Sequence, residues 1–511
     1  MASSDTVPLD PSAADALELR LHPDDVERLM RLPDLARLRA GRARNAAVEL
    51  VWHDTPDGAL AAEGLSLCER KAGRGTVWQM HRLRGSGAAT WPPGTPSPLV
   101  AAADRLADLG QKLPSPLLPL AACTGVLRSL PLGAAAGDMT VTLLQGTLRA
   151  VAAEQPVCRV MLGGPAAEIE ALALALTQHV RLMVPDAALA AEACRTAGRT
   201  VAATAIGAPD VPANVSVADA FAVLAGHLTG VILHWAPAAG TTAAEPVHQI
   251  RVAVRRLRSA MALFRRAIGD EVAASVKHDL KALQLVLGPA RDWDVFTAGT
   301  GRAVAAALPD DQPLARLLTA AERRRQDAYA DLRGFLDSAA FRRLAIRLAC
   351  LAAFRPWDGH PPPEAGTEEA EKRATTLAAP LAEFAGRALS RRLDRVLAPG
   401  DDLSLLSAAE LHALRIQGKR LRYAAEFFAP LHPARETRRF LRRIATLQDR
   451  LGHLNDNTVA ASLMAELGAT SGGRGYAVGV VRGFVAAGQR GARTQMERSW
   501  HKFRKTAPFW S

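Results

Sequence analysis

The stretch HQIRVAVRRLRSAMALF, residues 248–264, returns in the same chain as HALRIQGKRLRYAAEFF, residues 412–428. One constant offset of 164 residues (412 − 248) relates the two copies, and no insertion is needed over the surrounding segment, in which Leu283-Gln284 recurs as Leu447-Gln448 and Leu287-Gly288 as Leu451-Gly452. Within the quoted stretches this repeat offset carries His248, Arg251, Arg255, Arg256, Leu257 and Arg258 to His412, Arg415, Lys419, Arg420, Leu421 and Arg422. We therefore expect a duplicated helical unit whose two bundles are related by a pseudo-two-fold axis.

Each copy has the periodicity of an amphipathic helix. At about 100° per residue, an apolar face collects Ile250, Val254, Leu257, Met261 and Phe264. A stripe about 80° wide carries His248, Arg251, Arg255 and Arg258, with Arg256 at a far edge. We call this stripe with Arg256, and its counterpart in the second copy, the basic ridges. Ser407 and Glu410 form a predicted capping box at the start of the second helix, and Pro246 suits the first turn of the first.

The basic ridges need an explanation because like charges four residues apart on a helix repel. We expect no acidic partner within the stripe, and a solvated basic face is the simplest interpretation. The duplication favours another one, in which both ridges face a shared groove and bind an extended anion. His248 and His412 would then donate hydrogen bonds to phosphate, or orient a neighbouring arginine. Asp292 and Asp456 are expected to cap a helix or to orient a ridge arginine.

The charge of the chain is divided unequally. The chain has 511 residues, and residues 1–240 hold 20 basic and 23 acidic side chains, a net charge of −3. Residues 241–511 hold 43 and 28, a net charge of +15. This division indicates at least two units, one of which is suited to a polyanion.

The cysteine spacing and the apolar segments indicate in which cellular compartment the protein is expected. The five cysteines are scattered without a CxxC pair, which argues against a disulfide framework and a structural zinc site. No secretory signal is visible at the N-terminus, so we expect a cytoplasmic protein. We also expect a bacterial protein that needs no cofactor. Residues 218–236 are the best membrane candidate, but Asp219, His227 and His234 interrupt them and favour a buried helix. The sequence pattern favours no particular oligomeric state.

The pattern predicts three segments. Residues 1–215 mix short alternating and helical stretches and are expected to form an α+β domain. Residues 216–244 are expected to be a linker or connecting helix. Residues 245–511 lack strand signals and are expected to be all-α.

The repeated helices resemble the CHAD family, the conserved-histidine α-helical domain. HQIRVAVRRLRSAMALF with LGPARDWDV, and LHALRIQGKRLRYAAEFF with LGHLNDNTV, carry the resemblance over about residues 240–511. It implies two four-helix bundles around a basic cleft that binds inorganic polyphosphate without chemistry, and association with polyphosphate granules. The binding residues implied are His248, Arg251, Arg255, Arg256, Arg258, Arg291, His412, Arg415, Lys419, Arg420 and Arg422. Asn455 stands where the first copy has Arg291, so the second copy is expected to bind less strongly there.

The first half is similar, more weakly, to the CYTH triphosphate-tunnel fold, through HDTPDGALAAEGLSL at residues 53–67. That resemblance implies a β-barrel with helices and a carboxylate-bound metal. The family's opening E-x-E-x-K aligns with Ala16, Glu18 and Arg20, so one carboxylate is missing, and Cys68 replaces a strand arginine. The run PVCRVML at 156–162 has no carboxylate at all. A degenerate, inactive domain is expected, because such triphosphatases need clustered carboxylates to hold Mg²⁺ or Mn²⁺.

Three functions remain in competition. The first is non-enzymatic binding of inorganic polyphosphate, with targeting to granules. The second is a metal-dependent triphosphatase in residues 1–215, with the basic half as its substrate anchor. The third is a nucleic-acid binder. Two observations argue against it, since aromatic residues make up only 5% of the chain and the ridges lack interleaved residues on which bases could stack. We expect no specific nucleic acid and no membrane among the partners.

Overall fold

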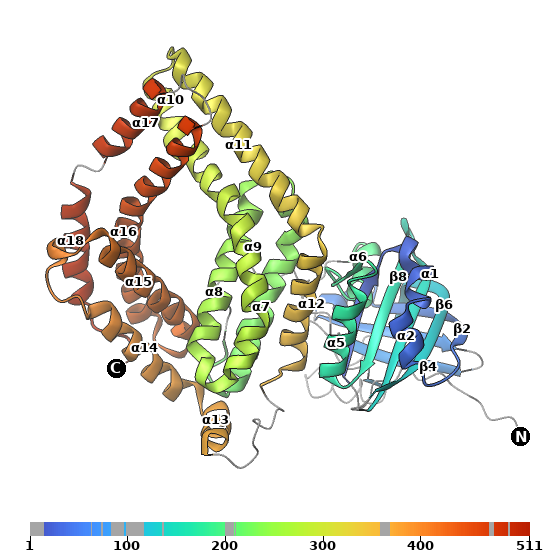
Figure 1. Ribbon diagram of the computed structural model, residues 1–511. Coiled ribbons are helices and arrows are strands. Elements are labelled where there is room, and N and C mark those ends of the chain that lie inside the picture. The colour runs from blue at the N-terminus through green and yellow to red at the C-terminus, as the bar shows by residue number, and fades with distance from the viewer. Residues whose placement is uncertain are drawn as a thin grey trace, which may run out of the picture. The chain divides into compact units, whose positions relative to one another are not determined.

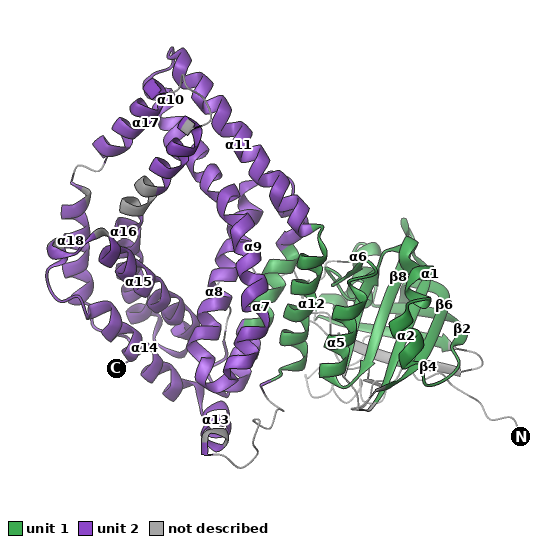
Figure 2. Cartoon of the chain, in the orientation of Figure 1, with its two compact units in different colours: residues 1–206, 225–234, 337–356 green, residues 207–224, 235–336, 357–511 purple. Residues whose placement is uncertain are grey.

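The computed structural model of the protein describes residues 15–62, 64–72, 75–82, 97–98, 117–134, 137–199, 209, 211–357, 368–469, 475–488 and 491–510 (Figure 1). The chain divides into two compact units, which Figure 2 shows in different colours. Unit 1 comprises residues 1–206, 225–234 and 337–356, and unit 2 comprises residues 207–224, 235–336 and 357–511. Neither unit is therefore one continuous stretch of sequence.

Unit 1 is built on one antiparallel sheet. Its strands lie in the order β5-β4-β3-β2-β6-β7-β8-β1-β9. Their bounds are β1 Asp15–Leu21, β2 Arg44–Asp54, β3 Leu65–Ala72, β4 Gly75–Arg82, β5 Ser97–Pro98, β6 Leu118–Ala134, β7 Gly137–Ala150, β8 Ala153–Gly164 and β9 Leu182–Met183. The α+β prediction is confirmed. The edge strands β5 and β9 do not pair with each other in the described residues, so the sheet is open and not the expected closed barrel.

Both faces of the sheet are buried, because apolar residues alternate along its strands onto each face. On one face, Leu17 and Leu19 of β1 pack in a core with residues of α1 (Val26–Met30), α2 (Pro33–Leu38), α5 (Ala166–Leu176) and α12 (Ala339–Phe354). On the other face, Trp52 and Cys123 pack in a second core with residues of α6 (Leu189–Thr196). Helix α6 contacts β2, β3, β6 and β7, so it covers this face of the sheet.

Unit 2 is helical, as predicted. Its first repeat contains α8 (Ala244–Ile268), α9 (Asp270–Phe296), a π-helical turn (Thr297–Gly301), α10 (Arg302–Ala307) and α11 (Gln312–Leu336), and α7 (Val217–Ala239) precedes them. Its second repeat contains α13 (Glu368–Ala378), α14 (Leu381–Leu397), α15 (Ala408–Phe428), α16 (Ala434–Ala469), α17 (Gly475–Gly488) and α18 (Ala492–Arg504). At the repeat offset, the single helix α11 corresponds to the pair α17 and α18.

Contacts between equivalent residues reveal the pseudo-two-fold axis. The amide of Val217 donates to the carbonyl of Ala379 over 3.1 Å, and the amide of Leu381 donates to the carbonyl of Val215 over 3.1 Å. The second bond is the first one with each partner replaced by its equivalent in the other repeat. Phe264 also meets its own counterpart Phe428, with ring centroids 6.2 Å apart. A residue can touch its own equivalent only near a symmetry axis, so the axis passes between α8 and α15.

The two repeat helices begin where their sequences predict. The amide of Glu410 donates to Ser407 Oγ over 3.3 Å, and the amide of Ser407 donates to Glu410 Oε2 over 2.8 Å, which completes the capping box. Pro246 lies in the first turn of α8. The apolar face is buried as predicted, and Val254, Leu257 and Phe264 are fully inaccessible.

Helix α7 contains the predicted membrane candidate. By length and composition it is the one helix of the described residues that could cross a membrane. Its most apolar window is 72% buried inside the protein, which is typical of a core helix.

We predict that Gly269→Ala destabilises unit 2 by about 1–3 kcal/mol, because Gly269 ends α8 with a φ of +87° that side chains rarely adopt. A Cβ there would also lie 2.7 Å from Nη1 of Arg373, whose Nε donates to the carbonyl of Ala267 over 2.8 Å. Gly386→Ala inside α14 is the matched control. Its Cβ meets no atom within 4 Å, and it should stabilise the helix by about 0.5–1 kcal/mol. Denaturation followed by circular dichroism measures both variants, and shifts in the same direction would contradict this account.

Candidate anion-binding site

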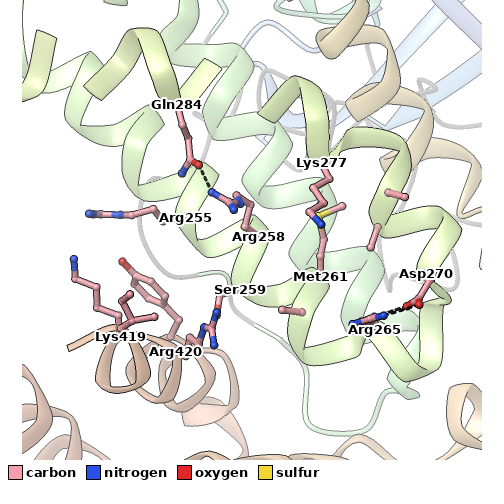
Figure 3. A pocket seen from close by; sticks show the side chains of 15 residues that line it. Arg255, Arg258, Ser259, Met261, Arg265, Asp270, Lys277, Gln284, Lys419 and Arg420 are labelled. Atoms are coloured by element: carbon pink, nitrogen blue, oxygen red, sulfur yellow. Dashed lines mark hydrogen bonds and ion pairs between the residues drawn. The ribbon is translucent and has the colours of Figure 1, made fainter. Parts of the chain in front are cut away.

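A pocket of about 880 Å³ lies between the two repeats (Figure 3). From α8 and α9 it is lined by Arg255, Arg258, Ser259, Met261, Ala262, Arg265, Asp270, Ala273, Ala274, Lys277 and Gln284, and from α15 by Ile416, Lys419, Arg420 and Tyr423. Four predicted residues, Arg255, Arg258, Lys419 and Arg420, therefore line one shared pocket. Arg255 and Lys419 are counterparts in the two repeats, so the ridges do converge at this point.

The charge of this pocket is almost wholly positive. Asp270 is the one acidic residue of its lining, and it already accepts a hydrogen bond from Arg265 Nη2 over 2.6 Å. The Nε of Arg255 is buried and has no hydrogen-bond partner among the described residues. A buried donor without a partner costs free energy, and an anion in the pocket would supply the missing acceptor.

Arg256 and Arg422 have a different role from the predicted one. Arg256 Nη2 donates to Glu426 Oε2 over 2.7 Å, and Arg422 Nε donates to Glu426 Oε1 over 2.8 Å. The Glu426 side chain is only 12% exposed. Our expectation that the stripe holds no acidic partner was wrong, because Glu426 lies four residues after Arg422 on the same face. Glu426 joins α8 to α15, and neither arginine lines the pocket.

This ion pair breaks the symmetry of the ridges. Arg258 is the counterpart of Arg422, and Arg420 is the counterpart of Arg256. In each equivalent pair one arginine lines the pocket while the other is held by Glu426. The counterpart of Glu426 in the first repeat is Ala262, so no second carboxylate restores the symmetry.

Arg251 and Arg415 lie outside the pocket lining and are placed alike in the two repeats. A Cβ on Gly288 would lie 3.5 Å from Arg251 Nη1, and a Cβ on Gly452 would lie 3.9 Å from Arg415 Nη2. Each guanidinium therefore lies close over a glycine of the following helix. Arg251 Nη2 also lies 3.8 Å from Asp292 Oδ1, which confirms that Asp292 orients a ridge arginine. The side chains of Asn455 and Asp456 lie outside the described part of the chain.

Two glutamines repeat the same contact. Arg258 donates to the side chain of Gln284, and Arg422 Nη1 donates to Gln448 Oε1 over 3.5 Å. These glutamines belong to the repeated Leu-Gln pair of the sequence. Their recurrence was visible there, but their contact with the ridge was not predicted.

His248, Arg291 and His412 also lie outside the pocket lining. The pKa of His248 is lowered, first by burial and then by Arg291, Arg255 and Arg251, while Glu245 opposes them. His248 and Arg291 therefore share the positive field of the first ridge. His412 is exposed on α15.

Sequence reasoning missed two further groups of cations. Lys277 of α9 lines the pocket one heptad before Gln284, a spacing that places both on one helix face. Arg391, Arg392 and Arg395 lie on α14, beside α15. The pKa of Arg392 falls to about 10, mainly through burial and further through Arg420, Arg395 and Arg391. The positive surface around Arg420 thus extends beyond the ridges.

In unit 1 the carboxylate of the expected metal site, Glu18, is buried in an ion pair with Arg159. Glu18 is 4% exposed, its Oε1 lies 3.4 Å from Arg159 Nε, and it accepts a hydrogen bond from the amide of Leu189 over 3.3 Å. Arg159 also pairs with Glu192 of α6. Burial is the largest cause that raises the pKa of Glu18. Cys68 is buried, and no group of three metal-ligating side chains is found among the residues that the structure describes.

Known proteins were compared with the chain. The model of the CHAD domain family matches residues 222–465. At the level of the family, this match supports a role related to polyphosphate. Comparison with curated proteins finds no match.

Three solved structures resemble parts of the chain. The CHAD domain of the plant Ricinus communis is 28% identical over 58% of this chain and 95% of its own, with a TM-score of 0.47. PptA from Streptomyces chartreusis is 18% identical over 56% and 100%, with a TM-score of 0.42. The putative adenylyl cyclase HpAC1 from Hippeastrum, described as having a dominant triphosphatase activity, is 13% identical over 37% and 97%, with a TM-score of 0.27. The CHAD family model thus matches this chain over residues 222–465, a region that contains both basic ridges.

Proposed function

We propose that unit 2 binds inorganic polyphosphate, without chemistry on it, in the pocket between α8, α9 and α15. The observation that carries the proposal is the convergence of Arg255, Arg258 and Lys277 from one repeat with Lys419 and Arg420 from the other. Polyphosphate carries about one negative charge per phosphate, and guanidinium groups engage two phosphate oxygens at once. A chain of phosphates would therefore relieve the repulsion between these five cations.

The cellular role follows from the ligand. We propose that binding targets the protein to polyphosphate granules in the bacterial cytoplasm. A nucleic-acid binder is the alternative for the same positive surface. Tyr423 is the one aromatic residue in the lining of the pocket, which gives few bases a stacking partner. Competition between long-chain polyphosphate and duplex DNA separates the two, and preferred binding of DNA would overturn the proposal.

We predict that Arg255→Ala/Lys419→Ala weakens polyphosphate binding by about 100-fold or more, because each lost charge-assisted hydrogen bond contributes about 1.5–3 kcal/mol. Arg255→Lys should also weaken binding, since lysine keeps the charge but loses the planar fork. The measurement is a titration with long-chain polyphosphate at two salt concentrations, and affinity should fall as salt rises. Arg302→Ala/Arg323→Ala is the control, because it removes two exposed cations of unit 2 outside the pocket. Equal losses in the two double variants would leave only a general charge effect.

We predict that polyphosphate binding strengthens as the pH falls from 8 towards 6. Without ligand, burial and three arginines hold the pKa of His248 below its usual value, so the imidazole is neutral at pH 7. A bound polyanion favours the charged form, so binding takes up a proton and is stronger where protons are plentiful. The effect is up to about tenfold for each unit by which the ligand raises the pKa. In His248→Gln the slope of affinity against pH should decrease, and an unchanged slope would exclude His248 from the ligand field.

We further propose that unit 1 is not an active triphosphatase. Glu18 is buried against Arg159, and α6 fills the adjoining face of the sheet, which supports this view. We predict no release of phosphate from tripolyphosphate with Mg²⁺ or Mn²⁺ above the level of a Glu18→Gln variant. Metal-dependent release that Glu18→Gln abolishes would establish the triphosphatase alternative instead.

A further inference from the structure

A second, smaller pocket lies between α16 and α18, which pack against each other. It has a volume of about 210 Å³ and is lined by Arg443, Thr446, Arg450, Gln495, Arg498, Ser499 and Lys502. None of these residues lines the larger pocket. We propose that this α16–α18 pocket is a second anion site, which binds a compact group of linked phosphates.

The four cations of this pocket converge without a counter-charge. No carboxylate lines it, although Asp449 and Glu497 are neighbours in sequence. Among the described residues, no hydrogen bond or ion pair engages the side chains of Arg443, Arg450 and Arg498. Lys502 lies in the last turn of α18, where the helix dipole alone would favour a cation. The three arginines are further inside their helices, so the dipole does not account for them.

The first repeat shows that the packing of these helices does not require the charges. At the repeat offset, α16 and α18 correspond to α9 and the last part of α11, which also pack against each other. The positions of Arg443, Arg450 and Arg498 are occupied there by Asp279, Val286 and Gly334. None of these three is a cation. The positive cluster is therefore a feature of the second repeat alone, and a structural role common to both repeats does not explain it.

The lining indicates the chemical class of the ligand. It consists of four cations, two hydroxyl residues and one amide, with no apolar side chain. Such a lining cannot bury the apolar anchor of a protein partner or of an acyl chain. It suits a small and densely charged group, and arginine matches the geometry of phosphate oxygens. We commit to a soluble inorganic oligophosphate, with tripolyphosphate as the probe.

The experiment is a calorimetric titration of the full chain with tripolyphosphate. Arg443→Ala/Arg498→Ala should remove one class of binding sites, with its affinity lowered at least about tenfold. Arg438→Ala/Arg493→Ala is the matched control, because it takes one arginine from each of the same helices but neither lines the pocket. The control should bind as the unaltered protein does. Equal isotherms for the two double variants would overturn the proposal.

The same titration is repeated in the background of Arg255→Ala/Lys419→Ala, which keeps this inference separate from the proposed function. If the larger pocket does not bind phosphate, that background changes nothing, and Arg443→Ala/Arg498→Ala still removes its own sites. Flotation with phosphatidylcholine vesicles that contain a phosphoinositide tests the other source of clustered phosphates. Binding to these vesicles without binding to tripolyphosphate would overturn the assignment to a soluble ligand. Circular dichroism melting of each variant establishes that the helices remain folded.

Discussion

Repulsion between like charges is the constraint on which the helical unit depends. Two helices with basic ridges pack together near a pseudo-two-fold axis, and cations of both ridges line one pocket whose one acidic lining residue, Asp270, pairs with Arg265. One buried carboxylate, Glu426, takes an arginine from each helix and so joins the repeats where they meet. Its neutralisation is local, and four other cations of the ridges, Arg255, Arg258, Lys419 and Arg420, line one pocket. The ion pair of Glu426 with Arg256 and Arg422 thus holds α8 against α15, while the cations that line the pocket create a positive potential there, which favours an anion.

The parts of this arrangement that depend on local periodicity were predictable from the sequence. The buried face of α8, the capping box at Ser407 and the stripe of cations follow from the 3.6-residue period and from cap chemistry. The division of labour between equivalent arginines was not predictable, because it depends on where the axis passes and on which helix carries Glu426. Lys277 and Gln284 were missed for a related reason, since they reach the pocket from α9 only through helix packing. In unit 1 the alternation predicted strands, but it carried no information on whether the edges of the sheet meet.

The two units differ in how far the protein compensates its buried and partly buried charged groups. In unit 1, Arg159 pairs with both Glu18 and Glu192, so its positive charge is compensated within the protein, and α6 covers this face of the sheet. In unit 2 the larger pocket has one acidic residue among several cations, and burial, followed by neighbouring arginines, lowers the pKa of Arg392 and of His248. A site that is balanced internally has little to offer a ligand. A site with uncompensated positive charge is stabilised when a ligand supplies the negative charge.

The amides of the equivalent residues Val217 and Leu381 donate to the carbonyls of Ala379 and Val215, which are also equivalent, and this symmetry has a consequence for ligand binding. A linear chain of identical phosphates has no direction, because it presents the same order of groups from either end. Where the ridges meet, Arg255 and its counterpart Lys419 would present equivalent cations to a chain that enters from either side. If polyphosphate binds as proposed, both orientations of the chain would be accepted at this point. The departure at Glu426 and Ala262 is the feature that would give such a chain a preferred direction.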